Sequence, residues 1–568
     1  MSLDAALFLA PIVLVPLCLA LLALVPAFRG RMLGLLPLAA LPGLVSAIFA
    51  PVGTNLEAPD LLFGLRLEIT AEGAIFLGAA SALWTAAGVF ARSYMSGTQD
   101  KAVFCAFWCL TLAGNLAVFV AGDAATFYLA FACVSLAAYP LVVHERTERA
   151  MRAGLVYIVL ALIGETFLLI GVLLAVAGAE GIMLADMREA LGASPDSLTI
   201  ALLVAGFGIK AGLVPLHVWL PLAHPAAPTP ASAVLSGAIV KAGIFGLIQF
   251  LPLGSDAGSW GTILVLGGIF GCWYGIVVGL TQFNPKTLLA YSTVSQMGIV
   301  IAMIGSGLSN GAGGAAAAAA ATLYAFHHGF AKGALFLGVG VAQKSGRSSL
   351  GFVTVALALV CLSVAGLPLL GGALAKLAIK GPLGGGLPEL LVTLSAVGTS
   401  LLLLRFLFLV QSFQHAERTA RPPILMVVPF AAMGVGAMVL PWFLFGDWSG
   451  QPLDYAYELD NLWTALWPIL LAMALAMLFL GFRPRRLPTI PEGDLLIPVE
   501  ALAGRGMEAW RSGLAQLQRD KPEIRRPLLA AAGLWLGRVE VWLANWAVAG
   551  TLMMLLLVAM ILSSVLFD

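Results

Sequence analysis

Six basic side chains and one carboxylate lie deep inside hydrophobic stretches of this 568-residue chain. The basic residues are Lys210, Lys241, Lys332, Lys376, Lys380 and Arg405, and the carboxylate is Glu165. A charge at the centre of a bilayer costs at least about 2.5 to 3.5 kcal/mol on insertion scales, so such residues usually face a hydrated interior and handle ions. Their presence predicts movement of charge across a membrane.

Buried amines with a neighbouring carboxylate can carry protons. Burial lowers the pKa of an amine and a nearby carboxylate raises it, so a change in their separation loads or unloads a proton. At an effective dielectric constant near 20, a contact between unit charges at 4 Å is worth about 4 kcal/mol, or roughly three pKa units. We therefore interpret Glu165 as the charge partner of Lys210.

The run LYAFHHGFAKGALF places a histidine and a lysine together. His328 and Lys332 stand four residues apart and share one face of a helix, whereas His327 points about 100° away. A packing hydrogen bond is one interpretation of such a histidine, but the neighbouring buried lysine favours a proton carrier. We expect Lys241, Lys332 and His328 to form a relay at the membrane midplane.

Composition defines the class of protein that positions these residues. Hydrophobic residues make up 61% of the chain and charged residues 10%, and the mean hydropathy is +0.99, which indicates an all-α polytopic membrane protein. The net charge of +1 indicates no nucleic-acid partner, and the six cysteines lack metal spacing, so we interpret them as core packing. Apolar stretches near twenty residues long predict about sixteen transmembrane helices. The expected spans are 5–27, 31–51, 71–92, 102–121, 124–143, 153–178, 197–219, 231–251, 260–280, 287–308, 318–342, 350–380, 387–412, 423–446, 462–482 and 541–567.

The basic residues of the loops test this count independently of hydropathy. If every span crosses the membrane, 22 of the 30 Lys and Arg residues fall on one side and only Arg66 and Arg188 on the other. The remaining six are the intramembrane residues. This segregation predicts an inner (plasma) membrane protein with both termini on the outer, periplasmic side.

Prolines and glycines interrupt two expected helices beside a buried lysine. The stretch GFGIKAGLVPLHVWLPLAHPAAPTP has five prolines after Lys210, and GLPLLGGALAKLAIKGPLGGG has Pro368 and two glycines before Lys376. Proline frees a backbone carbonyl, which is tolerated at membrane depth only where protein or water satisfies it. Paired discontinuous helices are typical of transporters, with simple kinks as the alternative. We expect Lys376 to face one bulk phase and Lys380, one turn further on, to lie closer to the exit.

Four pieces of the sequence resemble a known family. They are GFGIKAGLVPLHVWLPLAHPAAPTPASAVLSGAIVKAGIFGL, LLAYSTVSQMG, HHGFAKGALFL and GLPLLGGALAK, which follow the family's order and spacing within roughly residues 100 to 412. The family is that of the antiporter-like proton-conducting membrane subunits of respiratory complex I, membrane hydrogenases and Mrp-type cation/proton antiporters. The first piece is most similar to the antiporter-like membrane subunits of hydrogenase-4 and formate hydrogenlyase.

The resemblance implies two inverted five-helix repeats, each containing a broken helix with a lysine. We expect three N-terminal helices in residues 1–101, the first repeat in 102–251 and the second in 260–412. Residues 413–568 would form a C-terminal extension with an amphipathic segment at about 499–519 on the inner side.

The same resemblance implies roles for individual residues. Lys210 and Lys376 match the lysines of the two broken helices, and Lys241 matches a connecting lysine on the helix after the first break. Lys332 with His328 matches the basic pair that begins the second half-channel.

Three positions need separate comment against the family pattern. Ala132 occupies the place of a glutamate that normally pairs with the first broken-helix lysine, and Glu165 on the following helix is the nearest substitute. Leu222 stands where the hydrogenase branch usually has glutamate. Arg405 falls where members often carry an arginine, and we expect a structural or interfacial role for it. The two departures leave open a mainly scaffolding subunit.

The sequence contains no P-loop, no dinucleotide-binding glycine motif and no clustered metal ligands, so we expect no cofactor, metal or redox site of its own. We predict a proton-translocating subunit of a complex I-like or hydrogenase-like assembly, with other membrane subunits, peripheral redox subunits and the lipid bilayer as partners. A subunit of an Mrp-type antiporter, with Na⁺ or K⁺ as further ions, is the alternative. The membrane half of an inorganic-carbon uptake pair is a third hypothesis.

Overall fold

The computed structural model describes residues 3–61, 64–309, 313–413, 420–481 and 490–498, together with positions 501, 505, 508 and 512. The chain divides into two compact units. The first comprises residues 1–56 and 66–492 and contains every site residue predicted above. The second comprises residues 57–65 and 493–568, and its described part includes a turn in which the Leu61 N–H donates to the Ala58 carbonyl at 3.1 Å.

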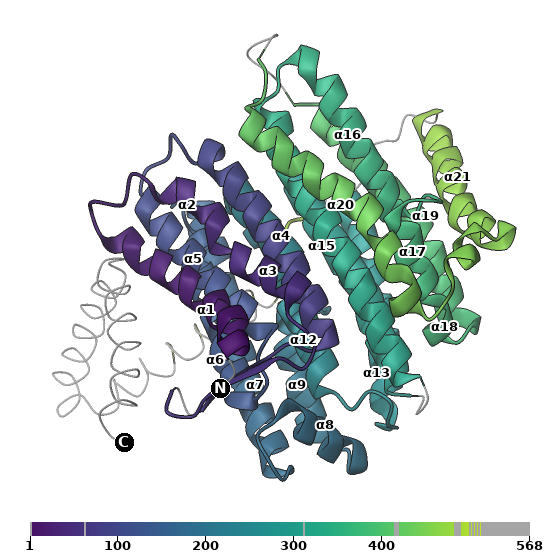
Figure 1. Cartoon of the computed structure of the whole chain (residues 1–568). Coiled ribbons are helices and arrows are strands. Elements are labelled where there is room, and N and C mark those ends of the chain that lie inside the picture. Colours follow the sequence, from purple (N-terminus) through teal and green to yellow (C-terminus); the bar gives the residue numbers. More distant parts are fainter. Residues whose placement is uncertain are drawn as a thin grey trace. The chain divides into compact units, whose positions relative to one another are not determined.

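Helices build the first unit and run side by side in it (Figure 1). In chain order the helices are α1 (Leu3–Leu24), α2 (Met32–Ala39), α3 (Leu41–Phe49), α4 (Ala71–Tyr94), α5 (Lys101–Val118), α6 (Ala124–Val142), α7 (Glu148–Ala177), α8 (Leu184–Ala193), α9 (Ser197–Ala211), α10 (Trp219–Ala226), α11 (Thr229–Val234), the π-helix η1 (Leu235–Ile239), α12 (Val240–Phe250), α13 (Ser259–Leu280), α14 (Pro285–Gly307), α15 (Gly314–Lys344), α16 (Arg347–Ala365), α17 (Gly371–Ala378), α18 (Lys380–Leu383), α19 (Gly386–Gln411), α20 (Ile424–Ser449), the 3₁₀-helix η2 (Leu453–Tyr457) and α21 (Leu459–Gly481). Strands β1 (Asn55–Ala58) and β2 (Leu65–Glu68) pair as a two-stranded sheet.

Short polar side chains begin five of these helices. Each accepts a hydrogen bond from a backbone N–H two or three residues further on, which satisfies a donor that the first helical turn leaves unpaired. The caps are Thr70 for α4, Asp123 for α6, Thr147 for α7, Asp196 for α9 and Asn284 for α14. They fix where each of these helices starts.

The helices that carry the central charges form the core of the first unit. The segment Thr229–Phe250 and helix α14 are buried along their whole length, and α15 is buried along most of it. Helix α15 packs against α14, α16 and α20. Surrounding helices turn large apolar side chains outward, as Phe352 does on α16 with 78% of its surface exposed. Such faces suit contact with lipid.

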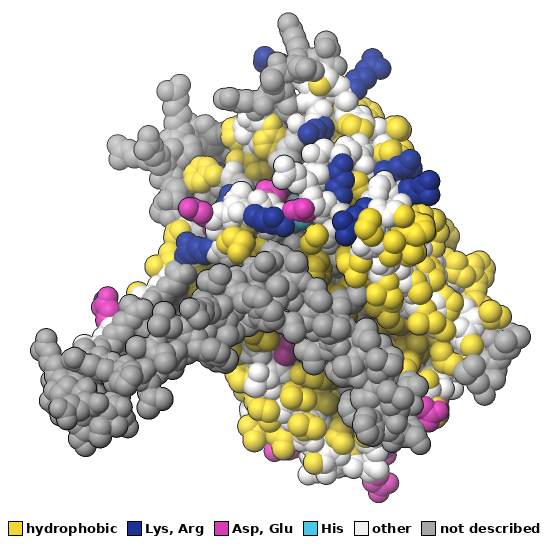
Figure 2. Space-filling view, turned by 90° about the vertical axis from the view of Figure 1, so that its left-hand side faces the viewer, with side chains coloured by type: hydrophobic (Ala, Val, Ile, Leu, Met, Phe, Trp, Pro, Cys, Tyr) yellow, Lys and Arg dark blue, Asp and Glu magenta, His cyan; other side chains and the backbone are white. Residues whose placement is uncertain are grey.

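Hydrogen bonds between loops show which loops lie together at each end of the bundle. At one end the Gly346 N–H donates to the Ala420 carbonyl (2.7 Å), and at the other the Gly254 N–H donates to the Gly307 carbonyl (2.9 Å). The first, called the basic end here, comprises residues 143–147, 281–284, 345–346, 420–423 and 490–492. Figure 2 shows Lys and Arg side chains gathered in the upper part of the face it displays, with hydrophobic side chains below.

Thirteen helices of the described residues are long and apolar enough to cross a membrane, which confirms the polytopic all-helical class. The expected span 31–51 corresponds to α2 and α3, which together are long and apolar enough to cross, and the expected span 350–380 contains the predicted break, between α16 and α17. The span 541–567 and most of the segment 499–519 lie outside the described residues, so the total of sixteen and the two inverted repeats stay predictions.

Candidate functional site

The two predicted breaks end their helices in the same way. At the end of α9 the N–H of Gly212 (φ +83°) donates to the Gly208 carbonyl at 2.9 Å, and at the end of α16 the N–H of Gly366 (φ +92°) donates to the Leu362 carbonyl at 3.1 Å. Glycine takes this left-handed conformation without strain, which makes it the usual residue just past a helix end. Each break therefore places the end of a helix, with its partial negative charge, inside the bundle.

Lys210 lies in the last turn of α9, just before the first break. Its side chain is 4% exposed, and its Nζ lies 5.5 Å from the ring centroids of both Phe131 and Tyr157. Aromatic faces attract a cation at this range. The neighbouring carboxylate is Glu165 on α7, which is 7% exposed and interacts electrostatically with Lys210.

Glu165 is held from the side of α6. Its Oε1 accepts a hydrogen bond from Ser135 Oγ at 2.5 Å, and its Oε2 has no hydrogen-bond partner among the described residues. No ion pair within 4.0 Å joins it to Lys210 in the described part of the chain. The predicted pair is therefore a separated one in this structure.

The central residues meet where three helices cross. Lys241 on α12 shares a hydrogen bond of 2.6 Å with His328 Nδ1 on α15 and also donates to the Ser236 carbonyl at 2.6 Å. Lys332, which is fully buried, donates to the Leu289 carbonyl of α14 at 3.1 Å. The structure thus brings together all three residues of the predicted midplane relay.

A close contact between glycines permits this meeting. Gly237 lies in the π-helix η1, one turn before Lys241, and Gly329 follows His328 on α15. A Cβ added to Gly237 would lie 2.2 Å from a Leu83 methyl and 2.9 Å from the Gly329 carbonyl oxygen. Only glycines let the two backbones approach this closely. A π-helical turn of this kind is common at functional sites.

Gly237→Ala is expected to push η1 away from α15, because the Gly329 carbonyl oxygen is backbone and cannot swing aside. We expect a stability loss of about 1 to 3 kcal/mol, typical of overpacking, together with slower transport. Thermal unfolding of the purified protein measures the first effect. Gly267→Ala on α13 is the matched control, because its added Cβ meets nothing within 4 Å. Equal unfolding temperatures for the two variants would contradict this account of the glycine contact.

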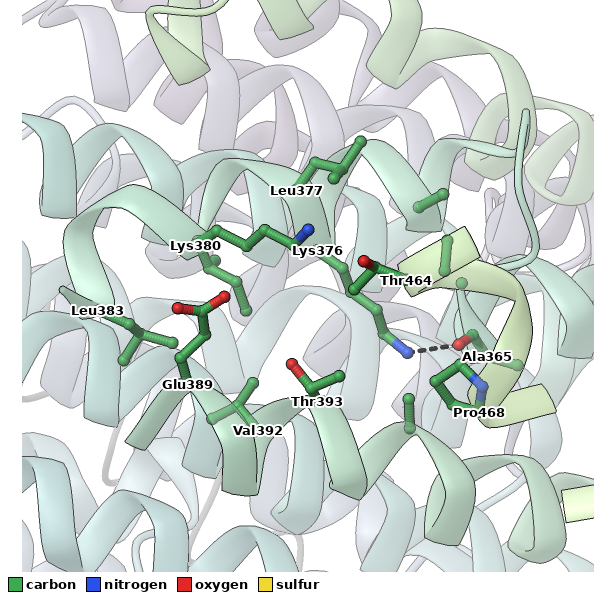
Figure 3. Close-up of a pocket in the computed structure, with 15 residues that line it drawn as sticks. Ala365, Lys376, Leu377, Lys380, Leu383, Glu389, Val392, Thr393, Thr464 and Pro468 are labelled. Atoms are coloured by element: carbon green, nitrogen blue, oxygen red, sulfur yellow. Dashed lines mark hydrogen bonds between the residues drawn. The ribbon is translucent and has the colours of Figure 1, made fainter. Parts of the chain in front are cut away.

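A pocket lies beside the second break (Figure 3). The Lys376 amine donates to the carbonyl of Ala365, the last residue of α16, at 2.5 Å. Lys380 donates to Asn461 Oδ1 at 3.0 Å, and Glu389 on the first turn of α19 lies close by and interacts with it electrostatically. The pocket thus places two amines and a carboxylate between the break and the end of the bundle opposite the basic end.

Sequence reasoning missed a buried lysine near the basic end. Lys286 was counted with the loop charges, but its side chain in the first turn of α14 is only 8% exposed. Its Nζ donates to the Ala227 carbonyl (2.8 Å) and to Ser232 Oγ (3.3 Å), at the break between α10 and α11. The break follows from the proline run, but only the fold shows that Lys286 reaches it.

His224 on α10 was also missed. It is fully buried, its ring packs on that of Phe336, and neither ring nitrogen has a hydrogen-bond partner among the described residues. It interacts electrostatically with Lys241, Lys286 and Lys332. The sequence feature that could have indicated His224 is its place between two prolines in LPLAHP.

A short segment, Ile490–Glu492, contacts the bundle at the basic end. Glu492 forms an ion pair with Arg149 at 2.6 Å and accepts from Thr287 Oγ1 at 2.6 Å, while Gln282 Nε2 donates to the Ile490 carbonyl at 3.0 Å. The Gln282 carbonyl in turn accepts from Arg405 Nε and a terminal nitrogen at 3.0 and 2.8 Å. In this structure, Arg405 holds a loop to α19.

The fold and the buried charges define a class, that of the antiporter-like membrane subunits. The family described as "NADH:quinone oxidoreductase/Mrp antiporter, TM" matches residues 121–402. NADH-quinone oxidoreductase subunit N of Desulforudis audaxviator is 30% identical over 428 residues, which cover 67% of this chain and 82% of that relative. The chain therefore belongs to this family, as the sequence analysis predicted.

One curated relative and one solved structure show further similarity to this chain. Hydrogenase-4 component B of Escherichia coli (strain K12) is 31% identical over 340 residues, covering 56% of this chain and 50% of the relative, so the chain spans about half of that protein. A chain in the structure of the Mrp complex from Dietzia sp. DQ12-45-1b shares the fold, with a TM-score of 0.76 and 22% identity over 94% of this chain and 63% of that one.

Proposed function

We propose that this chain is a proton-translocating, antiporter-like subunit of a multi-subunit complex I-like or hydrogenase-like assembly in the inner membrane. The observation that supports this most strongly is the series of buried charges across the bundle. The series begins at the buried Glu165 and Lys210, continues through the buried Lys241, His328 and Lys332, and ends at Lys376 and Lys380, which are half-buried and line the pocket. Placing a charged side chain inside the membrane costs free energy, so such residues usually have a function.

Unpaired polar atoms along this series support a hydrated route. Glu165 Oε2, His328 Nε2 and both ring nitrogens of His224 are buried without a hydrogen-bond partner among the described residues. Leaving one such group unsatisfied costs about 1 to 3 kcal/mol, so buried polar atoms nearly always bond protein or water. Water at these atoms would connect the amines and supply the medium in which protons move.

Two helix breaks mark the ends of the proposed route: the second break, beside Lys376, and the break between α10 and α11, beside Lys286. The pocket around Lys376 and Lys380 leads from the second break towards the end opposite the basic end. By the positive-inside rule the basic end faces the cytoplasm, so this pocket would open on the outer side, where both termini are proposed to lie. Lys286, at the α10–α11 break, stands at the basic end of the same system.

An Mrp-type antiporter subunit is the second candidate, and one observation favours it. The fold match to a chain of the Dietzia Mrp complex extends over 94% of this chain. In that case the partners would be membrane subunits alone, and Na⁺ or K⁺ would move against protons. The similarity to hydrogenase-4 component B and to the NADH-quinone oxidoreductase relative supports the respiratory assembly instead.

Purification of the tagged chain in mild detergent from its own membranes tests the two proposals. We expect iron–sulfur or flavin subunits to co-purify, and reconstituted complex to acidify or alkalinise vesicles when its redox substrate is supplied. A complex made only of membrane subunits that exchanges cations for protons would overturn the respiratory assembly in favour of the antiporter. A complex without any proton movement would overturn both.

A further inference from the structure

The proposed series has a gap between the central relay and the second break. The Lys332 amine is held on the Leu289 carbonyl of α14, whereas the Lys376 amine is held on the Ala365 carbonyl of α16. No described hydrogen bond joins the two lysines. A titratable side chain that interacts with both neighbourhoods would give a proton a way to pass between them.

His327 occupies this gap. It is the neighbour of His328 on α15 but, as the helical spacing predicts, its ring faces a different helix. Its side chain is 4% exposed, and its Nε2 lies 3.0 Å from Ser363 Oγ, two residues before Ala365 on α16. It interacts electrostatically with both His328 and Lys376. The imidazole therefore interacts electrostatically with the central relay and hydrogen-bonds a residue beside the second break.

Helix α17 packs tightly against this His–Ser pair. A Cβ added to Gly372 would lie 1.7 Å from the Ser363 carbonyl oxygen and 2.9 Å from His327 Cε1. Gly372 and Lys376 are four residues apart on α17 and so share a helix face. The absence of a side chain at Gly372 lets the face that carries Lys376 come directly against His327 and Ser363.

We propose that His327 and Ser363 carry protons between Lys332 and Lys376, which makes His327 a second histidine of the translocation route. This inference rests on the proposed function. A proton arriving at Nδ1 of His327 would release the one on Nε2 to Ser363 Oγ, and the hydroxyl would pass its own proton towards a neutral Lys376 amine. His327 and Ser363 end the step with as many protons as they began, because imidazole and hydroxyl both donate and accept, and the proton that Lys332 loses is gained by Lys376.

His327→Gln separates this role from simple helix packing. The glutamine amide reaches the position of Nε2 and keeps a hydrogen bond to Ser363, but it does not take up and release a proton. We expect proton transport by the reconstituted complex to fall roughly 100-fold or more, the low end of what a lost proton carrier costs. Assembly and the unfolding temperature should stay at wild-type values. Transport at the wild-type rate would overturn the proposal.

Ser363→Ala provides a second, independent variant, because it removes only a hydroxyl. It should lower transport like His327→Gln, and the double variant should be no worse than either single one, since both break the same step. If His327→Gln fails to assemble, wild-type transport in Ser363→Ala overturns the proposal. Lys376→Ala is the reference: normal transport there refutes the proposed route through this lysine, whereas loss of transport in Lys376→Ala together with normal transport in His327→Gln contradicts only the present inference.

Discussion

Lys376→Ala should abolish proton transport by the assembled complex, a loss of at least about 100-fold. Its amine lies at the negative end of α16 and lines the pocket that leads to Lys380 and Glu389. Alanine leaves no group there to receive a proton from the buried series or pass it to the pocket. Dye-reported pH changes in proteoliposomes measure transport, and gel filtration measures assembly.

Lys344→Ala is the matched control for that experiment. Lys344 ends α15 at the basic end, is exposed and lies outside the proposed route. The complex with Lys344→Ala should transport protons at the wild-type rate. Retained pumping in Lys376→Ala would refute the assignment of this lysine, and loss of the complex would favour the scaffolding hypothesis.

Lys210→Ala should have an effect of similar size at the other end of the series. The variant removes the only described amine that faces Glu165 across the aromatic cage of Phe131 and Tyr157, so the charge pair that is proposed to load and unload protons no longer exists. Coupled transport should be lost while the complex persists. The same vesicle assay and gel filtration report on both.

Glu165→Gln tests the partnership directly. If Glu165 acts through Lys210, this variant should slow transport, and combining it with Lys210→Ala should add nothing further. An undiminished rate in Glu165→Gln would leave Lys210 without its proposed partner. It would also show that the loss of a glutamate at Ala132 has no substitute on α7.

The sequence was sufficient for features that depend on spacing along one helix. His328 and Lys332 share a face because they are four residues apart, and His327 turns away for the same reason. Proline and glycine runs marked both breaks, because those residues act on the local backbone. Charge segregation between loops indicated how the chain threads from one end to the other.

Features that depend on two distant segments could not be predicted from the sequence. From the sequence, Lys286 is predicted to lie in a loop. In the structure its amine donates to the Ala227 carbonyl, 59 residues earlier in the chain. The partner of His327 could not be found from the sequence, because Ser363 is one of many small polar residues in apolar helices. The contact of Gly237 with Gly329 likewise has no local signature.

The central claim is that the buried amines form a hydrated route across the membrane. A high-resolution cryo-electron microscopy map of the whole complex in lipid tests it most directly. The account predicts ordered water at Glu165 Oε2, at the free nitrogens of His328 and His224, and between His327 and Lys376. A map in which aliphatic side chains seal these atoms, with no solvent between the lysines, would contradict it.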